Sequence, residues 1–164
     1  MDPKLLEKVC NTPGVPGHED LVQDIVMEEF RACCDETRRD SLGNVIGVKR
    51  ASTPPAGRER PFRVALAAHA DEIGMMVKHI DDNGFLRVQN VGGFDTRNLF
   101  ARRVLVQGRK DLIGVLNPAG RPIHIATDEE KKKTYTVGEF FVDLFMPKTQ
   151  VEKLVRIGDP VTLI

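Results

Sequence analysis

The 164-residue chain changes its hydrophobic pattern near Ile73, and this change limits the possible folds more than any other feature. Before this point, apolar residues recur at the three- and four-residue spacing of amphipathic helices. After it, short runs of β-branched and aromatic residues are separated by turn residues at close intervals. The sequence therefore predicts an α/β part followed by an all-β module, with one short helix near the end.

The first part of the chain is predicted to begin with two helices. Asp2 and Pro3 are a favourable cap and first-turn pair for a short helix. A second and longer helix is indicated by apolar residues at helical spacing over residues 21–30, behind two acidic residues. Turn residues at 40–44 and a strand at Val45–Val48 are expected next.

An apolar run over residues 62–68 ends abruptly on His69, followed by Asp71 and Glu72. Residues 64–68 are predicted to form a short buried strand, and ligands gather just beyond strand ends in α/β sheets. Side chains two residues apart on an extended chain point the same way. Asp71 can therefore accept a hydrogen bond from the imidazole N–H that a metal leaves free, which makes His69 a candidate metal ligand.

A single histidine at a strand end is more often a hydrogen-bonded structural residue than a metal ligand, and the spacing alone leaves both alternatives open. Other motifs accompany it, namely Asp40-Ser-Leu-Gly-Asn44 upstream and Val91-Gly-Gly-Phe-Asp95 downstream. With the His69-Ala-Asp-Glu-Ile-Gly74 motif, these make the chain resemble, nearly end to end, the tetrahedral (TET) aminopeptidases. These are cytosolic peptidases with two co-catalytic metal ions, often labelled glutamyl aminopeptidase.

The resemblance implies a fold of two parts. Residues 1–71 would form the amino-terminal portion of an α/β peptidase domain. A small all-β, barrel-like dimerisation domain would be inserted at residues 72–161, and residues 162–164 would return to the peptidase domain. Because the family's inserted domain joins two subunits, and such dimers build a hollow tetrahedral dodecamer, we expect a homo-oligomer that is at least a dimer.

The resemblance also implies a metal-dependent aminopeptidase that removes amino-terminal residues from peptide substrates. Two divalent ions, Zn or Co, would activate a water and polarise the scissile carbonyl. His69 would bind one ion, and Asp71 would take part in catalysis by orienting His69. In the family the bridging Asp, the catalytic Glu pair and the last His follow the inserted domain. We therefore expect the chain to correspond to the enzyme's amino-terminal half and to be inactive alone.

The composition excludes several classes of protein. The sequence has 24 basic residues (Lys and Arg) and 24 acidic residues (Asp and Glu). The chain therefore has no net positive charge that would favour binding to nucleic acid or to an acidic membrane surface. The amino terminus carries charges where a signal peptide needs an apolar run, and no stretch reaches the roughly 18 apolar residues of a membrane span. A cytoplasmic protein without a membrane partner is expected. Three cysteines, with Cys33 and Cys34 adjacent, do not indicate a disulfide framework.

The remaining polar motifs are expected to be structural. His79 and His124 have no second ligand at a metal-binding interval, and His18 is expected to be a loop or first-turn residue in solvent. Residues 81–84 predict a hairpin turn rather than a calcium loop, because the later acidic ligands are missing. The charged run at 128–133 is typical of a solvated loop.

A second hypothesis belongs to a different class of function. The chain would act as a non-catalytic oligomerisation or binding module, with the β domain carrying the function. The absence of further predicted metal ligands favours this hypothesis, and tight binding of two ions per chain would contradict it. A glycosidase is disfavoured, because no pair of facing carboxylates is indicated.

Overall fold

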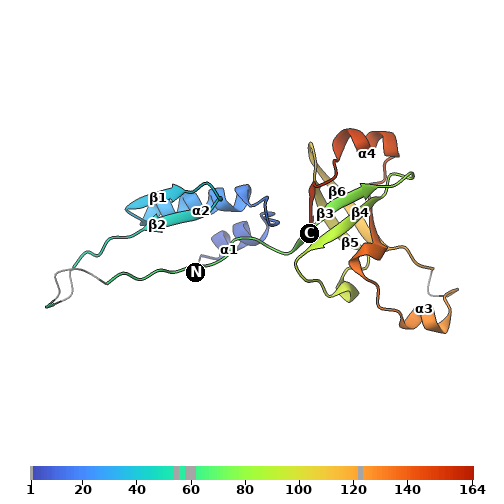
Figure 1. Ribbon diagram of the computed structural model, residues 1–164, viewed down its shortest axis with the longest axis horizontal. Helices are drawn as coiled ribbons and strands as arrows, with labels where there is room; N and C mark the ends of the chain where they lie inside the picture. Colours follow the sequence, from blue (N-terminus) through green and yellow to red (C-terminus); the bar gives the residue numbers. More distant parts are fainter. Residues whose placement is uncertain (1, 54–55, 58–61, 122–123) are drawn as a thin grey trace. The chain divides into compact units, whose positions relative to one another are not determined.

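The computed structural model describes residues 2–53, 56–57, 62–121 and 124–164. The chain divides into two compact units, Met1–Asp71 and Glu72–Ile164 (Figure 1). The division falls where the sequence predicts the inserted domain to begin. That the second unit interrupts a longer peptidase domain stays a prediction. No helix in the described part of the chain is long and apolar enough to cross a bilayer.

The first unit begins with the two predicted helices, α1 (Pro3–Cys10) and α2 (Asp20–Cys33). The Asp2 carboxylate caps α1 by accepting a 2.9 Å hydrogen bond from the Lys4 backbone N–H. Pro3 occupies the first turn, where its missing N–H costs nothing. These local signals explain why the first helix starts where the sequence predicts.

A two-stranded antiparallel sheet of β1 (Glu36–Arg39) and β2 (Val45–Val48) packs against α2. Its turn is held by Asp40, whose carboxylate accepts backbone hydrogen bonds from Leu42 and Asn44 at 3.0 and 2.9 Å. Among the described residues of this unit, the buried hydrophobic side chains are Val15, Val22 and Ile25. The second strand was predicted, whereas β1 was not.

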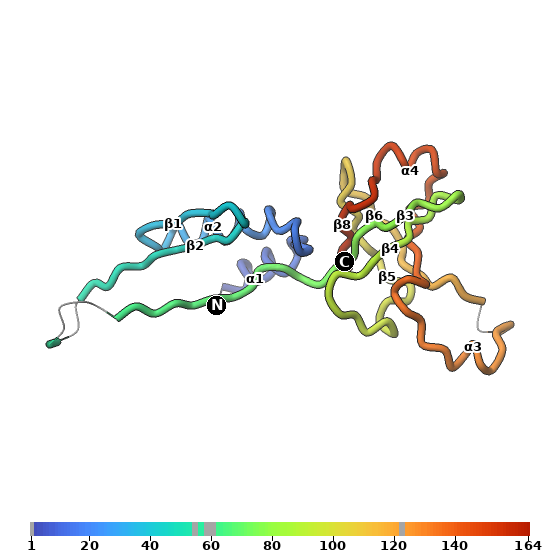
Figure 2. Tube along the Cα trace, viewed as in Figure 1, coloured from blue at the N-terminus to red at the C-terminus, as the bar shows by residue number. Residues whose placement is uncertain are grey.

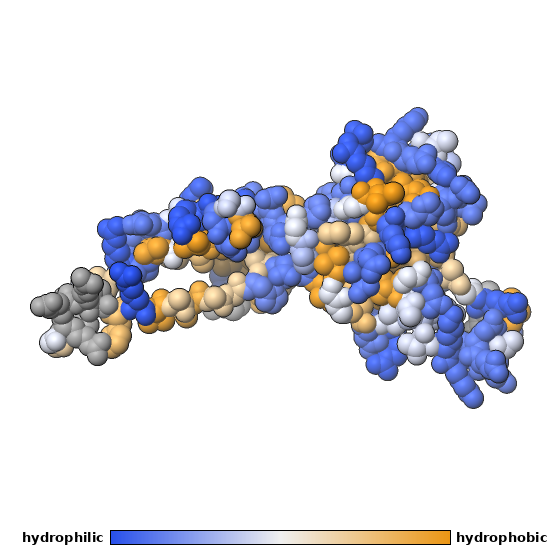
Figure 3. All heavy atoms as spheres, in the orientation of Figure 1, coloured by the Kyte–Doolittle hydropathy of each residue, from blue (hydrophilic) through white to orange (hydrophobic). Residues whose placement is uncertain are grey.

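The prediction of a buried strand at residues 64–68 is wrong for this structure. Residues 63–71 are extended, but they pair with no strand among the described residues (Figure 2). Val64 and Leu66 are 82% and 95% exposed, and apolar colour runs along this segment at the surface (Figure 3). A strand needs neighbouring strands to bond its backbone and covering elements to bury its side chains, and the described part of this unit supplies neither.

The second unit is a closed barrel in which the strands follow the order β3-β4-β7-β6-β5-β8, with every pairing antiparallel. The strands are β3 (Gly74–Ile80), β4 (Leu86–Val91), β5 (Arg102–Gln107), β6 (Asp111–Pro118), β7 (Phe140–Asp143) and β8 (Pro160–Leu163). The predicted all-β, barrel-like module is thus present. Closure removes the free sheet edges that an open sheet of this size would expose.

Alternating side chains of these strands fill the barrel. Met75 and Val77 of β3, Val104 and Val106 of β5, and Phe140 of β7 are all at most 1% exposed. The period-two alternation follows from the geometry of a strand with one face in the core. The β3–β4 hairpin with its turn at 81–84 is confirmed.

Shorter elements complete the second unit. They are η1 (Thr96–Asn98), α3 (Asp128–Lys132), η2 (Val137–Glu139) and α4 (Lys148–Leu154), of which α4 is the predicted late helix and packs against β3. The solvated loop predicted at 128–133 is instead largely the helix α3. Residues 162 and 163 lie in β8 and pair with β5, so they belong to the barrel and not to a returning peptidase domain.

Candidate functional site

His69 and Asp71 lie on the extended segment that ends the first unit. The His69 side chain is 83% exposed, and that of Asp71 is 37% exposed. The imidazole Nδ1 lies 3.0 Å from Asp71 Oδ1 and 3.1 Å from the Asp71 carbonyl oxygen. The two-residue spacing on an extended chain therefore brings the side chains together as the sequence predicts.

The partners of Nδ1 determine the tautomer of His69. A carbonyl oxygen can only accept a hydrogen bond, and an ionised carboxylate can only accept as well. Nδ1 must therefore carry the proton and donate it to Asp71. In the neutral imidazole this leaves the Nε2 lone pair directed away from Asp71 and available to a ligand, which is the arrangement that metal-binding histidines use.

The site is incomplete within the part of the chain that the structure describes. No group of three or more His, Cys, Asp or Glu side chains lies close enough there to hold a metal ion. One imidazole with one orienting carboxylate can supply a single ligand. A hydrolytic metal centre needs at least three protein ligands together with an open position for water or substrate. The roles assigned to His69 and Asp71 therefore stay predictions.

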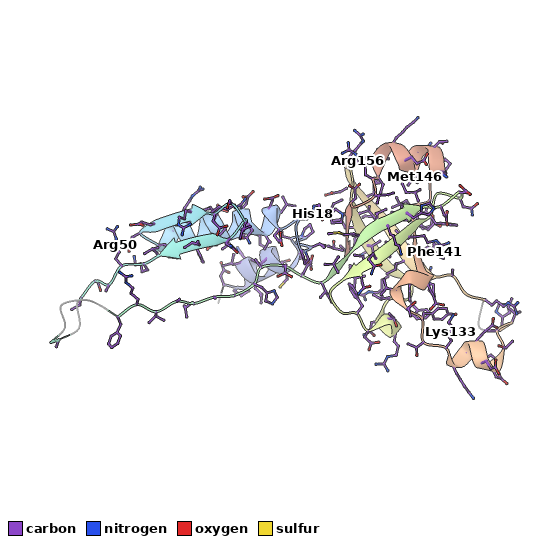
Figure 4. All side chains as sticks on the ribbon, viewed as in Figure 1. His18, Arg50, Lys133, Phe141, Met146 and Arg156 are labelled. Atoms are coloured by element: carbon purple, nitrogen blue, oxygen red, sulfur yellow. The ribbon has the colours of Figure 1, made fainter. Side chains whose placement is uncertain are left out.

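The other polar motifs have structural partners or face solvent. Asp81 accepts 3.0 Å backbone hydrogen bonds from Asn83 and Phe85 and pairs with Arg87, so it organises the hairpin turn. Burial acts to raise the pKa of Asp81, but the hydrogen bonds from Phe85 and Asn83 and the Arg87 guanidinium together lower that pKa below its ordinary value. His18, labelled in Figure 4, is exposed in the turn before α2. His79 and His124 are also exposed.

A cavity of about 290 Å³ in the second unit was not predicted. Its lining residues are Thr96, Arg97, Phe100, Lys132, Lys133, Thr134 and Tyr135. Two of its cations are already engaged, because Arg97 binds Asp95 and Lys133 binds Glu139. The volume lies at the lower limit for small-molecule pockets. We assign this cavity no ligand.

Comparison with known proteins shows that the chain is similar to aminopeptidases. A family profile described as M42 glutamyl aminopeptidase matches residues 43–164. The chain is 37% identical over 123 residues to the lysyl aminopeptidase of Pyrococcus furiosus, which covers 72% of this chain and 33% of that protein. The chain spans less than half the length of the curated relatives it matches.

The fold of the chain is also similar to that of solved peptidase structures. The TET aminopeptidase of a marine sediment archaeon of the Thaumarchaeota superposes with a TM-score of 0.84 and 27% identity, covering 98% of this chain and 43% of that one. The TET1 peptidase of Pyrococcus horikoshii, described as able to assemble into a tetrahedron or a large octahedral shell, superposes with a TM-score of 0.78. It is 27% identical and covers 98% of this chain and 46% of that one.

Proposed function

The chain belongs to the M42 glutamyl aminopeptidase family, and we propose on this ground that it supplies the first part of the active site of an aminopeptidase acting on peptides. The family match over residues 43–164 carries this proposal. It spans His69, Asp71 and the whole barrel. The free Nε2 of His69 adds a chemical reason to place the site at this position.

His69 would hold one of two divalent ions, Zn or Co, through Nε2, while Asp71 fixes the imidazole by accepting the Nδ1–H. This donor pair fits a metal site as one ligand with its orienting carboxylate. The described residues contain no group that could complete the site, so the other ligands and the general base would come from elsewhere in the complete polypeptide. Two bound ions would polarise the scissile carbonyl and activate water.

Substitution of His69 in the complete polypeptide tests this assignment. His69→Ala should abolish hydrolysis of leucyl- or glutamyl-anilide and lower the metal content, with little effect on folding because the side chain is 83% exposed. Asp71→Asn should weaken metal affinity by about 10- to 100-fold, because an amide orients the imidazole less strongly. Elemental analysis gives the metal content, and circular dichroism reports folding.

His79→Ala is the matched control, because His79 is also exposed and has no predicted role. It should leave activity and metal content unchanged. An unaltered metal stoichiometry in His69→Ala would contradict the proposed ligand. The 164-residue chain alone should show no measurable anilide cleavage, since one imidazole cannot hold the ion firmly and the described residues supply no group of three metal ligands.

Oligomerisation through the barrel is a second function that the structure favours. The barrel is closed and has its own core, so it can fold as a module. The second unit nevertheless leaves large apolar side chains at least 48% exposed, namely Ile73, Phe100, Ile113, Ile125, Phe145 and Ile157. Exposed apolar side chains of this number are common at subunit contacts. The assembly described for the Pyrococcus horikoshii peptidase gives independent support.

We expect at least a dimer in solution. Light scattering across a range of concentrations should give a mass of twice the 18.3 kDa chain or more. Phe145→Ser, on the barrel surface at 72% exposure, should shift the equilibrium towards smaller species if the barrel provides the contact. Leu42→Ser, at an 87% exposed position of the first unit, is the control. A monomer mass at every concentration would refute the role of the barrel.

A further inference from the structure

Two adjacent thiols lie at the carboxyl end of α2. Cys33 is the last residue of the helix and is exposed, and Cys34 is its half-buried C-cap. Their Sγ atoms are 3.9 Å apart and share a hydrogen bond. No disulfide joins them, and the third cysteine of the chain, Cys10, is a separate free thiol.

The packing around Cys34 fixes the position of its thiol. Its backbone N–H donates a 2.7 Å hydrogen bond to the Phe30 carbonyl, which ends the helix. Its Sγ lies against Gly47 of β2, where an added Cβ would come within 2.7 Å of both Cys34 Sγ and the Phe30 ring. A residue with a side chain at position 47 would thus displace the thiol. Burial and the hydrogen bond with Cys33 raise the pKa of Cys34, so it is a protonated thiol at neutral pH.

Geometry limits what this pair can bind. A disulfide is disfavoured, because adjacent Cα atoms lie about 3.8 Å apart and disulfides usually need about 4.4 to 6.8 Å. A structural zinc ion needs about four protein ligands, and the described residues provide no group of three around these thiols. The two Sγ atoms, 3.9 Å apart, are nevertheless close enough for one small thiophilic atom to contact both.

We propose that Cys33 and Cys34 form a chelating dithiol site for thiophilic ligands that need only two protein donors, with trivalent organoarsenicals as the best-matched class. Such an arsenic atom keeps one bond to carbon and takes two sulfurs, so the pair completes its coordination. A single thiol such as Cys10 can supply only one of these bonds. The exposed Cys33 gives the ligand access from solvent.

The binding step balances without an oxidant. With phenylarsine oxide, two As–S bonds form, both S–H bonds break, and the arsenic-bound oxygen leaves with the two protons as water. Arsenic stays trivalent, and both sulfurs stay at the thiolate level. The half-buried position of Cys34 does not prevent the reaction, because the neighbouring Cys33 thiol is exposed and its Sγ lies 3.9 Å from that of Cys34.

The experiment treats the folded chain with phenylarsine oxide and measures the intact mass after desalting. The wild-type chain and the matched control Cys10→Ser should each retain one phenylarsenic group. Cys33→Ser and Cys34→Ser should retain it about 100-fold more weakly or lose it, because the second bond provides the chelate effect. Excess glutathione should leave the wild-type adduct intact, whereas dithiothreitol should remove it.

Circular dichroism checks that each variant is folded. Cys34 contacts Gly47, so Cys34→Ser could unfold the chain. In that case the Cys33→Ser variant, which changes an exposed residue, tests the proposal alone. An equally stable adduct on Cys33→Ser, loss of the adduct from Cys10→Ser, or no adduct on the wild-type chain would each overturn the proposal. Peptide mapping that places arsenic on Cys33 and Cys34 together would support it.

Discussion

Glu139 has several hydrogen-bond donors around its carboxylate. The side chain binds the Lys133 ammonium and accepts hydrogen bonds from the Thr136 backbone N–H and hydroxyl at 2.9 and 3.1 Å. Lys133, labelled in Figure 4, also lies 5.3 Å from the centre of the Tyr135 ring. The bond from Lys133, followed by that from Thr136, lowers the pKa of Glu139 to about 2. The pair ties the end of α3 to the start of β7.

This lowered pKa sets the direction of a pH effect. Because the folded-state pKa is below the ordinary value of 4.5, ionised Glu139 stabilises the fold above about pH 4.5. That stabilisation is lost as the pH falls from 4.5 towards 2. Lys133→Gln should raise the Glu139 pKa towards its ordinary value, as measured by a carboxyl-carbon NMR titration. Lys132→Gln is the control and should leave the titration unchanged. A wild-type pKa near 4.5 would contradict the contact.

At the same scale, the His69–Asp71 contact could be predicted because it depends only on two-residue spacing along an extended chain. The arrangement of Cys33 and Cys34 could not. Their adjacency is visible in the sequence, but the 3.9 Å separation and the space left by Gly47 depend on how β2 packs against α2. The complete donor set of a metal centre could not be predicted either, because ligands distant in sequence meet only after folding.

Elements with strong local signals were predicted correctly from the sequence. The Asp2 cap defines α1, and the turn at 81–84 defines the β3–β4 hairpin. Thr127 and Glu130 form a capping box for α3. The sequence contains this pattern, but the run of charged residues that follows Thr127 was interpreted as a solvated loop. The polar strand β1 carries no apolar alternation and is specified by its pairing with β2. Formation of the strand expected at residues 64–68 likewise depends on pairing with a neighbouring strand.

Close packing of β6 against β7 gives a stability prediction for the barrel. A Cβ at Gly114 would lie 2.6 Å from the Val142 side chain and 2.9 Å from the Asp143 carbonyl oxygen. Gly114→Ala should therefore destabilise the barrel by about 1–3 kcal/mol, the usual cost of overpacking. Urea unfolding followed by fluorescence of Tyr135, the only tyrosine in the sequence, reports on this unit.

Gly138→Ala is the matched control for this change. Gly138 has no atom within 4 Å of the position an added Cβ would take, and its φ is not positive. Its unfolding midpoint should stay close to that of the wild-type chain. Equal midpoints for Gly114→Ala and the wild type would show that β6 and β7 are further apart than the structure indicates.

On the scale of the whole molecule, the two units are stabilised to different extents. The barrel closes its hydrogen-bond ladder and buries a continuous cluster that includes Met75, Leu86 and Phe140. The first unit buries only Val15, Val22 and Ile25 among its described hydrophobic residues, and it leaves its longest apolar segment exposed. A region with many buried contacts and paired backbone groups has a high free energy of local unfolding. The barrel should therefore be the more stable unit.

Hydrogen exchange of the 164-residue chain can test this difference. Amides of β5, whose residues pair with both β6 and β8, should exchange slowly because they open only when the barrel unfolds. Amides of residues 64–68 should exchange at rates close to those of an unstructured peptide, because that segment has no partner strand among the described residues. Amides of β2 serve as the internal reference, since they belong to the first unit and are paired with β1. Protection of residues 64–68 equal to that of β5 would mean that this segment is paired in solution, through a second copy of the chain if protection rises with concentration.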